Sequence, residues 1–541
     1  MYRDKQLIIL MAGKGTRLYP LTLGFPKCLL SIRQKPAIYN MIVPLINEGL
    51  RDITIVVNME NKELITDFLK SSFGNINLNI NYIVQKSASG PGAALKLTES
   101  YINKSTILLL GDTLCTFPKN YDNSWIGVNE VDESEKYKYC MIECNNKNDI
   151  IKIIDKPKGV VATKNAAIGL YYFKNYKLLK KILKEKISKV FGEYQLSSYF
   201  NLYMAEENIK IEKIDDWEDI GTLEGYMQTN KDNFNCRNFN TLYLDDLGVI
   251  HKKSKYNKIV SEMSWFKEIE NTDYEKLTPK FYNNNKFVFE YGIEYYDYLT
   301  LSEYMTFYPL IDYSKTIIFE SLLKKMLDIY LKNKIVSLEF NDLFHDILIN
   351  KTFDRIKLWD RQDLVKREKV SINGNMYLGI LKCLEKLNTS IEKICNSSID
   401  FVTIIHGDMA FSNILFSPRS LNFKLIDARG NFGIDTIYGD YRYDLAKLRH
   451  CYHGRYDEIV NDLFNIDEDK GINYYFYKDN DYKIFDDLMI KYNIDILDIE
   501  LIEALLFISM IPLHDDYPNR QLMFFCMGIE ILNSQIKKRG L

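Results

Sequence analysis

A glycine-rich loop near the start of the chain has the composition of a triphosphate-binding loop. It occupies residues 11–17 and follows the apolar run 7–10. Two glycines allow a tight turn whose backbone N–H groups can approach an anion, and Arg17 and Lys27 add positive charge that a triphosphate can share. We assign nucleotide binding to four positions of this loop: Ala12, Gly13, Gly15 and Thr16.

Two common phosphate-binding patterns do not fit this loop. A dinucleotide fingerprint requires a third glycine where Leu18 stands, and a Walker loop requires Gly-Lys-Ser/Thr after four free positions. The loop therefore predicts a nucleotide site outside both of these classes.

The elements that position the loop alternate between strands and helices. Apolar runs at 53–57, 80–84 and 106–110 are separated by helical segments, which include a helix expected near 93–101. This alternation predicts a parallel sheet, in which ligands bind beyond the carboxyl ends of the strands. Asp112 follows one such strand, where its carboxylate can hold Mg²⁺ against phosphate oxygens or, alternatively, cap a helix.

A longer pattern surrounds the loop: Gly13-x-Gly15-Thr16-Arg17-x-x-Pro20-x-Thr22, then Pro26-Lys27-x-Leu29-Leu30. It closely resembles the signature of the sugar-phosphate and phosphocholine nucleotidylyltransferases. Met11 departs from the family pattern, because most members carry alanine there. The resemblance implies catalytic roles for Arg17 and Lys27, with Mg²⁺ as the cofactor and a nucleoside triphosphate as a substrate.

The same resemblance implies roles for six later residues. Asp219 matches the second metal carboxylate, and Gln85 and Gly90 fall where relatives contact the nucleobase. The positions that correspond to acceptor binding are Lys156, Gly169 and Glu193. Taken alone, the residues leave plainer roles open: Gln85 could satisfy a turn, Lys156 could be a solvated surface lysine, and Glu193 could be a helix-cap partner.

A second group of residues with chemical potential lies far downstream. The apolar run 403–405 leads into His406-Gly407-Asp408, Asn413 follows five residues later, and the run 424–426 ends at Asp427. This is the spacing of a kinase catalytic loop and its metal-binding aspartate. It resembles the aminoglycoside phosphotransferase and choline kinase superfamily. The resemblance implies that Asp408 orients or deprotonates a hydroxyl, that Asn413 and Asp427 hold Mg²⁺, and that ATP is the phosphate donor.

The region before this loop is expected to supply the ATP phosphate lysine. We assign it to Lys252 in a hairpin over 242–253, with Glu262 on the following helix as its partner; Lys253 is a competing candidate. Residues 287–295 resemble the strand that enters a kinase hinge. His406 and Asp444 are expected to brace the catalytic loop.

These resemblances predict an α/β, Rossmann-like nucleotidylyltransferase domain over residues 1–230. An α+β two-lobed kinase-like domain of the aminoglycoside phosphotransferase type is expected to follow, with an N-lobe over 231–310 and a helical C-lobe over 311–541. The polar, asparagine-rich stretch 229–235 is the expected linker. Helical periodicity at 314–331 and 376–394 is typical of the large lobe.

Composition excludes several classes of protein. At 541 residues the chain is too long for one core, and its net charge of −3 gives no general reason to expect nucleic-acid binding. Nine cysteines without a Cys-x-x-Cys pair indicate reduced thiols in a cytoplasmic protein. No run approaches the roughly 20 apolar residues of a membrane span. The assembly state is open, with a homo-oligomer as one alternative.

The simplest hypothesis combines both halves. The kinase-like domain would phosphorylate a small alcohol or sugar, and the first domain would couple that phosphate to a nucleoside monophosphate. The sequence Asp427-Ala428-Arg429-Gly430 departs from the choline-kinase pattern and looks more like kinase-like domains attached to nucleotidylyltransferases in capsule or surface-glycan pathways. CTP is the favoured nucleotide, with UTP and dTTP open.

Three alternatives remain at this point. The kinase fold could be a non-catalytic binding or oligomerisation module. The whole chain could be a nucleotide-sugar-sensing regulator, or the two activities could serve unrelated substrates.

Overall fold

The computed structural model divides into two compact units, which are described separately. Unit 1 comprises Met1–Lys70 with Ile76–Phe234, and unit 2 comprises Ser71–Asn75 with Asn235–Leu541. The described residues are 2–19, 22, 26–32, 35–74, 76–190, 192–232, 240–255, 258–283, 289–308, 310–336, 340–432, 434, 436–468, 470–477, 482–515 and 517–541. Pro20 of the loop pattern, residues 233–235 of the expected linker and residues 287–288 of the expected hinge strand lie outside them.

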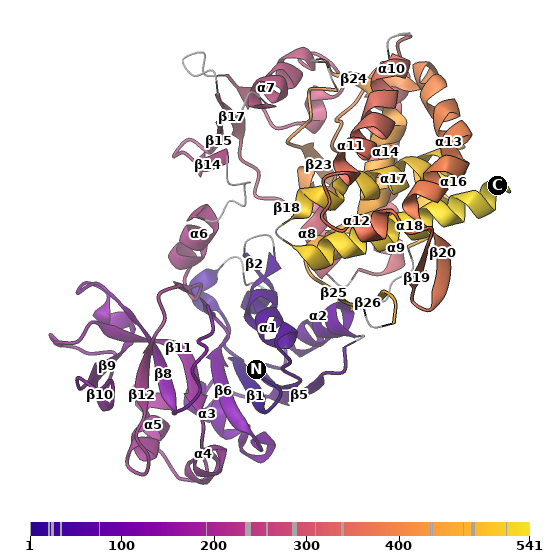
Figure 1. The fold of residues 1–541 in the computed structure, drawn as a ribbon. Coiled ribbons are helices and arrows are strands. Elements are labelled where there is room, and N and C mark those ends of the chain that lie inside the picture. Colours follow the sequence, from indigo (N-terminus) through magenta and orange to yellow (C-terminus); the bar gives the residue numbers. More distant parts are fainter. Residues whose placement is uncertain are drawn as a thin grey trace. The chain divides into compact units, whose positions relative to one another are not determined.

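Unit 1 is built on a nine-stranded sheet with parallel strands at its centre (Figure 1). Its strands are β1 (Lys5–Met11), β4 (Asp52–Val57), β5 (Asn79–Val84), β6 (Ser105–Leu110), β8 (Trp125–Glu130), β9 (Cys140–Cys144), β10 (Ile150–Asp155), β11 (Asn165–Phe173) and β12 (Lys210–Lys213). Their order is β10-β9-β11-β6-β1-β4-β5, with β8 pairing both β11 and β12. Strands β6, β1, β4 and β5 run parallel, as predicted, whereas β11 lies antiparallel to β6.

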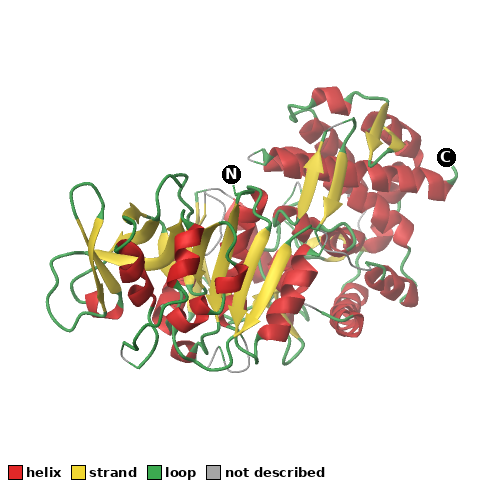
Figure 2. Cartoon of the chain, turned by 90° about the horizontal axis from the view of Figure 1, so that it is seen from below, coloured by secondary structure: helices red, strands yellow, loops and turns green. Residues whose placement is uncertain are grey.

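The central strand explains why the loop after it is fixed. All seven residues of β1 are buried, as expected for a nearly continuous apolar run between two parallel neighbours. Helices flank these strands in Figure 2. They are α1 (Ala37–Asn47), α2 (Lys62–Phe73), α3 (Pro91–Lys96), α4 (Tyr176–Ile182), α5 (Leu196–Met204) and α6 (Leu223–Asp232). The helix expected near 93–101 is shorter, because α3 ends at Lys96 and a separate 3-10 turn covers Glu99–Tyr101.

Two small ribbons complete unit 1. The first pairs β2 (Ser31–Ile32) with β3 (Lys35–Pro36). The second pairs β7 (Thr113–Cys115) with β13 (Trp217–Asp219) in antiparallel register, so that Asp219 lies opposite Thr113. This register brings the segment near residue 219 to the carboxyl end of β6, although about a hundred residues separate the two in sequence.

Unit 2 begins with a four-stranded antiparallel sheet of order β14-β15-β17-β16. The strands are β14 (Asn240–Leu244), β15 (Val249–Ser254), β16 (Phe281–Tyr282) and β17 (Glu290–Glu294), and α7 (Lys258–Glu268) follows β15. The predicted hairpin is confirmed. Its turn is closed by the Asp245 carboxylate, which accepts hydrogen bonds from the N–H groups of Leu247 and Val249 at 2.9 Å each.

The remainder of unit 2 is mostly helical, with short two- and three-stranded ribbons. The helices are α8 (Leu301–Phe307), α9 (Asp312–Lys332), α10 (Phe340–His345), α11 (Lys351–Ile356), α12 (Gln362–Val365), α13 (Ile380–Asn396), α14 (Tyr441–Tyr452), α15 (Tyr456–Val460), α16 (Ile484–Lys491), α17 (Ile496–Met510) and α18 (Pro518–Arg539). The strands are β18 (Leu299–Thr300), β19 (Lys369–Ile372), β20 (Asn375–Leu378), β21 (Val402–Ile404), β22 (Ile414–Ser417), β23 (Asn422–Leu425), β24 (Tyr438–Asp440), β25 (Phe464–Asp467) and β26 (Asn473–Phe476).

One predicted helix is wrong at its start. Residues 376–378 belong to β20, and the helix α13 begins only at Ile380. The reason is the Asn373-Gly374 pair, whose φ values of +50° and +76° form the tight turn between β19 and β20. The long helix expected over 314–331 is confirmed as α9, with bounds Asp312–Lys332.

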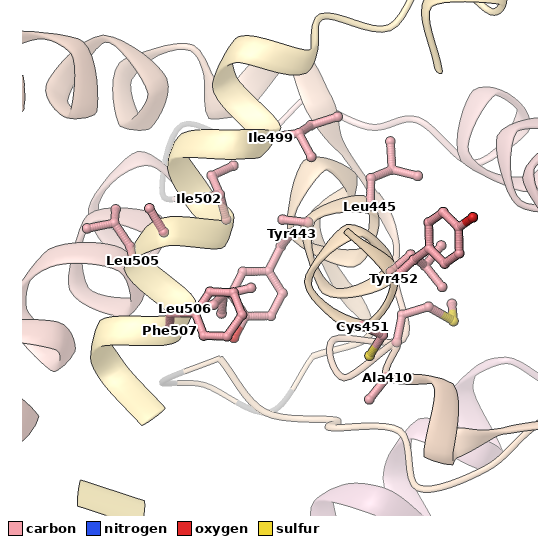
Figure 3. Packing of buried hydrophobic residues seen from close by; sticks show 14 of the residues in the cluster. Ala410, Tyr443, Leu445, Cys451, Tyr452, Ile499, Ile502, Leu505, Leu506 and Phe507 are labelled. Atoms are coloured by element: carbon pink, nitrogen blue, oxygen red, sulfur yellow. The ribbon is translucent and has the colours of Figure 1, made fainter. Parts of the chain in front are cut away.

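The core of unit 2 is organised around α17. From Ile499 to Met510 every residue of this helix is buried, which is typical of a helix surrounded by others. Figure 3 shows its side chains Ile499, Ile502, Leu505, Leu506 and Phe507 beside those of α14, which include Tyr443, Leu445, Cys451 and Tyr452. The Phe411 N–H group also lies 3.4 Å from the Cys451 sulfur, so the loop 406–413 is fixed to the same core.

Among the described residues, no helix combines the length and the apolar character needed to cross a membrane. The cysteines in this part of the chain form no disulfide.

Candidate functional site

The glycine loop after β1 adopts a conformation that favours glycine. Gly15 has a φ of +66°, in the left-handed region, and a 3-10 turn over Thr16–Leu18 follows it. The Thr22 hydroxyl donates a hydrogen bond to the Gly15 carbonyl at 2.8 Å and closes the loop. Met11 fits this packing because residue 111 is glycine: a Cβ atom there would lie 2.8 Å from Met11 Cγ.

Three predicted side chains converge on one point in unit 1. A Cβ atom placed on Gly221 would lie 2.9 Å from Asp112 Oδ2, 2.9 Å from Asp219 Oδ1 and 3.2 Å from Arg17 Nη2. The pairing of β7 with β13 produces this arrangement, and the Ile220 N–H group donates to the Asp112 carbonyl at 3.1 Å. The two carboxylates and the guanidinium thus face a common space beside a residue without a side chain.

Lys27 supplies the direct counter-charge to Asp112. Its Nζ lies 2.6 Å from Asp112 Oδ2, while Arg17 Nη2 lies 3.9 Å from the same oxygen. Burial acts to raise the pKa of Asp112, but the Lys27 ammonium outweighs it and lowers the pKa below its ordinary value. Burial and the nearby Asp112 charge raise the pKa of Asp219. The Asp112 and Asp219 carboxylates together therefore carry more negative charge than the Lys27 ammonium alone neutralises.

Tyr139 is a member of this site that sequence reasoning missed. Its hydroxyl donates to Asp219 Oδ2 at 3.3 Å, and the Gly221 N–H group donates to Asp219 Oδ1 at 2.8 Å. Both oxygens of the carboxylate are therefore oriented. Tyr139 precedes Asp219 by 80 residues and belongs to no sequence motif, so it could be identified only from the structure.

A divalent cation fits the two carboxylates. Asp112 and Asp219 would be its protein ligands, because Asp112 Oδ2 and Asp219 Oδ1 both lie 2.9 Å from the same point beside Gly221. Mg²⁺ commonly binds through one or two carboxylates and takes its remaining ligands from phosphate oxygens and water.

Two of the positions assigned to the nucleobase lie together. Gln85 Nε2 donates to the Gly90 carbonyl at 3.3 Å, which is the turn-satisfying role that the sequence left open. Gly90 has a φ of +96°, and a Cβ atom there would lie 2.6 Å from the Tyr194 carbonyl oxygen and 2.8 Å from Glu193 Cβ. Glu193 is therefore close to this turn, and it accepts a hydrogen bond from Gln195 Nε2 at 3.4 Å.

The other acceptor positions lie on or after long strands. Gly169 in β11 has a φ of +91°, and a Cβ atom there would lie 2.4 Å from the Thr113 hydroxyl oxygen, next to Asp112. Lys156 follows β10 with a φ of +45°, and its side chain is exposed. No interaction within unit 1 links Lys156 to Asp112 or Asp219 in the described part of the structure.

Residues 6–235 match the family model for nucleotidyl transferase. The match falls almost entirely within unit 1, which resembles a nucleotidyl transferase domain. The chain is 30% identical over 224 residues to the bifunctional protein GlmU of Methanococcus vannielii, which covers 40% of this chain and 51% of that protein. It is 31% identical over 211 residues to the mannose-1-phosphate guanyltransferase of Hypocrea jecorina, which covers 36% of this chain and 57% of that protein.

The chain thus spans about half the length of these curated relatives. Among solved structures, a UDP-glucose pyrophosphorylase complexed with UDP-glucose aligns with a TM-score of 0.39 and 24% identity, covering 42% of this chain and 98% of that one.

Unit 2 contains a second group of predicted site residues. Lys252 on β15 is buried, and its Nζ lies 2.7 Å from Glu262 Oε2 on α7 and 3.0 Å from Asp427 Oδ1. Burial acts to lower the pKa of Lys252, but these two carboxylates outweigh it and raise the pKa. Lys253, the competing candidate, points to solvent. The Tyr291 hydroxyl on β17 donates to the same Glu262 oxygen at 3.1 Å.

The loop 406–413 carries the other predicted residues of unit 2. The Asn413 side-chain amide donates to the Asp408 carbonyl at 2.9 Å, and the Ile426 N–H group donates to the Asn413 carbonyl at 3.0 Å. Asp427 follows with a φ of +58°. These bonds join the Asp408 loop to the segment of Asp427, so Asp408, Asn413 and Asp427 are held within one framework.

His406 and Asp444 lie where bracing residues were expected. His406 Nε2 lies 2.9 Å from the Ile426 carbonyl and must donate there, so Nδ1 accepts from the Asp408 N–H group at 3.3 Å. Burial lowers the pKa of His406, consistent with this neutral form. The Asp444 carboxylate accepts from the N–H groups of His406 and Gly407 at 2.8 Å each.

Lys447 is the residue of unit 2 that sequence reasoning missed. Its Nζ lies 3.1 Å from Asp408 Oδ1. Burial acts to raise the pKa of Asp408, but the Lys447 ammonium outweighs it and holds the pKa well below its usual range. Lys447 stands three residues after Asp444 on α14, so the two share a helix face, and that spacing was a usable signal.

Proposed function

We propose that the chain is a bifunctional enzyme. Unit 2 would transfer the γ-phosphoryl group of ATP to a hydroxyl of a small alcohol or sugar. Unit 1 would then transfer a nucleoside monophosphate to the resulting phosphate, releasing pyrophosphate. The product is a nucleotide-activated precursor of the kind used for capsule or surface polysaccharide.

The transferase step follows from charge placement in unit 1. An acceptor phosphate oxygen forms a bond to the α-phosphorus of the nucleoside triphosphate, and the bond from that phosphorus to the bridging oxygen breaks, so that pyrophosphate leaves with its electron pair. The attacking oxygen is already ionised, so no side-chain nucleophile is needed. Arg17 and Lys27 neutralise the triphosphate and the charge that develops on the leaving group.

Mg²⁺ bound by Asp112 and Asp219 would supply electrostatic stabilisation of the phosphates. The observation that carries this proposal is the convergence of Asp112, Asp219 and Arg17 on the space beside Gly221, with Lys27 paired to Asp112. A domain that only sensed a nucleotide sugar would have no need for two carboxylates aligned in this way.

The acceptor and nucleotide are assigned by class. The relative named for mannose-1-phosphate guanyl transfer favours a sugar phosphate over phosphocholine. The Asp427-Ala428-Arg429 sequence also argues against choline as the alcohol. CTP stays our first choice of nucleotide, and UTP, dTTP and GTP complete the set to be tested.

The phosphotransfer step is supported by the contacts of unit 2. A hydroxyl oxygen forms a bond to the γ-phosphorus of ATP, the β,γ-bridging bond breaks to release ADP, and the hydroxyl proton passes through Asp408 to solvent. Because the Lys447 ammonium keeps Asp408 ionised, Asp408 is a weak base, and its main contribution is to orient the hydroxyl. Asn413 and Asp427 would hold Mg²⁺, while Lys252, held by Glu262, would contact the ATP phosphates.

The test measures pyrophosphate release with each nucleoside triphosphate against a set of sugar and alcohol phosphates, then against the unphosphorylated compounds with ATP and Mg²⁺. We expect Asp112→Asn to abolish release in every case. Asp408→Asn should abolish it only where the acceptor is unphosphorylated, and the pre-formed phosphate should restore it.

Three outcomes would overturn this proposal. No pyrophosphate release by the wild type with any nucleotide and acceptor would favour a regulator without transferase chemistry. Full release by Asp112→Asn would show that the reaction does not use this site. Release from phosphates with no ATP consumption by any unphosphorylated compound would leave unit 2 as a binding or oligomerisation module.

A further inference from the structure

Lys156, the residue assigned to the acceptor phosphate, is held firmly at the start of the loop 156–161 in unit 1. Its φ of +45° lies in the left-handed region, which residues other than glycine rarely adopt. Its N–H group donates to the Tyr139 carbonyl at 3.1 Å, and the Asp155 carboxylate before it accepts from the Ser197 hydroxyl at 2.9 Å. The backbone at this position is therefore fixed, while the side chain stays exposed.

The far end of this loop is held by a buried lysine. Lys136 is 4% exposed, and its Nζ donates to the Val161 carbonyl at 2.8 Å and lies 2.6 Å from Glu133 Oε2. A buried ammonium is unfavourable unless it is paired and hydrogen-bonded, and an apolar side chain of similar volume often gives at least equal stability. The contact of Lys136 with Val161 therefore indicates that the position of the loop matters beyond its packing.

Both ends of the loop are joined to the same short turn. The 3-10 turn Lys136–Lys138 is followed by Tyr139, whose N–H group donates to the Lys136 carbonyl at 3.2 Å. The first residue of the turn holds Val161, and Tyr139 at its end holds Lys156. The side chains of Val161 and Tyr139 pack against one buried cluster, which consists of Val131, Met141 and Ala166. The loop and the turn thus form one packed unit.

Tyr139 connects this turn to the candidate metal site. Its hydroxyl donates to Asp219 Oδ2 at 3.3 Å, and its ring packs against Trp217, two residues before that aspartate, with 5.5 Å between the ring centroids. Within the described part of unit 1, Lys156 makes no contact of its own with Asp219, but Tyr139 contacts both. A displaced loop would therefore change the separation between Lys156 and Asp219. A misplacement of about 1 Å can cost about 100-fold in rate.

We infer that Lys136 is a positioning residue for the acceptor phosphate: by holding Val161, it fixes the loop 156–161 so that Lys156 presents its ammonium at a set place relative to Asp219. The inference rests on the proposed transferase function and adds to it a residue that touches neither the nucleotide nor the acceptor. Within the described residues, the Lys136 ammonium contacts Glu133 and Val161 and no residue assigned to the nucleotide. Its loss therefore weakens use of the acceptor and spares the nucleoside triphosphate.

The test measures pyrophosphate release by the full chain with Mg²⁺. CTP, UTP, dTTP and GTP are combined with three acceptor probes: α-D-glucose 1-phosphate, D-mannose 1-phosphate and glycerol 3-phosphate. With the pair that reacts best, we expect Lys136→Met to raise KM for the acceptor by about ten-fold or more, and to leave KM for the triphosphate within about two-fold. Lys136→Arg keeps a cationic donor at this position and should restore most of the loss.

Lys138→Met is the matched control. Lys138 is exposed on the same turn, and its Nζ lies 2.9 Å from Glu135 Oε1 rather than on the loop. Both KM values of this variant should equal those of the wild type. If Lys136→Met does not fold, Glu133→Gln takes its place, because it leaves the ammonium in the protein without its counter-charge. That variant should raise the same KM by a smaller factor, about two- to five-fold.

A double-mutant cycle separates positioning from a general loss of packing. In a Lys156→Ala background no acceptor lysine is left to position, so adding Lys136→Met should change KM for the acceptor by less than about two-fold. Hydrogen exchange provides a second readout that does not depend on activity. The amides of the loop 156–161 should exchange faster in Lys136→Met than in the wild type, and at the wild-type rate in Lys138→Met.

The outcomes separate this inference from the proposed function. If the wild type releases no pyrophosphate with any nucleotide and acceptor, the transferase proposal itself fails. If the wild type reacts but Lys136→Met leaves KM for the acceptor unchanged, raises both KM values equally, or has its full effect in the Lys156→Ala background, the inference about Lys136 is wrong while the transferase proposal stands. Unchanged exchange of the loop amides in Lys136→Met, or a wild-type KM for the acceptor in Lys156→Ala, leads to the same conclusion.

Discussion

The two candidate sites each pair a lysine with an aspartate proposed to hold metal, but they do so differently. In unit 1, Lys27 contacts Asp112 at 2.6 Å, and the structure gives it no second carboxylate among the described residues. In unit 2, Lys252 contacts Asp427 at 3.0 Å and also Glu262 at 2.7 Å. Glu262 is not a proposed metal ligand, so it can keep Lys252 in place when Asp427 turns to a cation.

Lys27 must therefore change partners when a ligand binds, whereas Lys252 is already held in position before the nucleotide binds. When a triphosphate binds to unit 1, the Lys27 ammonium has to interact with both Asp112 and the phosphates. In unit 2, the Glu262 carboxylate fixes Lys252 independently of the nucleotide. The same residue types therefore give a site that rearranges and a site that is preorganised.

The largest effect is expected from Asp112→Asn in the candidate site of unit 1. The change removes a proposed Mg²⁺ ligand and the ion-pair partner of Lys27 together, so kcat/KM for pyrophosphate release should fall by about 1,000-fold or more. Steady-state assay of pyrophosphate measures it. Asp122→Asn, on an exposed side chain of the same domain, is the matched control and should stay within about two-fold. A loss below ten-fold in Asp112→Asn would show that Asp112 is not a metal ligand.

The next effect, Glu262→Gln, tests the preorganised lysine directly. Without the Glu262 charge, Lys252 should pair with Asp427 alone. KM for ATP in phosphoryl transfer should then rise by about 10- to 100-fold. Breaking the buried pair should also destabilise unit 2 by about 3 kcal/mol, measured by denaturant unfolding. Glu268→Gln, exposed on the same helix, is the control. An unchanged KM for ATP would mean that Glu262 does not position Lys252.

A change in pH dependence is expected from Lys447→Met. Loss of the ammonium should raise the pKa of Asp408 towards or above its usual value of about 3.9, so the acid limb of phosphoryl transfer moves up by about one pH unit or more. A lowered carboxyl pKa in the folded state gives stability above the unfolded pKa that is lost as pH falls through the folded pKa. That acid-sensitive part of the unfolding free energy should shrink in the variant.

Rate profiles and unfolding curves measured from about pH 8 to well below about pH 4, the usual pKa of an aspartate, show both consequences. The equivalent change in unit 1, Lys27→Met, should raise the pKa of Asp112 in the same direction. If the acid limb of Lys447→Met coincides with that of the wild type, Lys447 does not control the charge of Asp408.

The smallest effect is expected from Tyr139→Phe. The change removes one hydrogen bond to Asp219 without altering the ring packing against Trp217, whose centroid lies 5.5 Å away. A loss of about 1 kcal/mol, or two- to ten-fold in kcat/KM, is the expected result of pyrophosphate assay. Tyr137→Phe, with 62% of its residue exposed, should have no effect. Equal behaviour of the two variants would show that Tyr139 does not orient Asp219.

Much of unit 1 was readable from its sequence because the signals are local. The continuous apolar run of β1, the left-handed glycine at position 15 and an aspartate after β6 each follow from a few neighbouring residues. To predict that Asp112 and Asp219 lie together required the family resemblance, because only the pairing of β7 with β13 brings them together. Tyr139 had neither a local pattern nor a resemblance, and it was missed.

Unit 2 was harder to read for a related reason. Hairpin, helix and catalytic-loop spacing placed Lys252, Glu262, Asp408 and Asp427, and the structure brings Lys252, Glu262 and Asp427 into contact. The Asn373-Gly374 turn was overlooked, because helical periodicity after it masked a two-residue hairpin signal. Lys447 was also missed, although it shares a helix face with Asp444.

The contact between Met11 and Gly111 makes these two positions interdependent. A methyl group on residue 111 meets Met11 Cγ at 2.8 Å, whereas the other close atoms, the Leu10 carbonyl oxygen and Met11 Cα, lie at 3.0 and 3.3 Å. A smaller residue at position 11 would remove the shortest of these contacts and leave the two backbone contacts in place. The methionine that departs from the family pattern thus adds to the pressure that keeps a glycine immediately before Asp112.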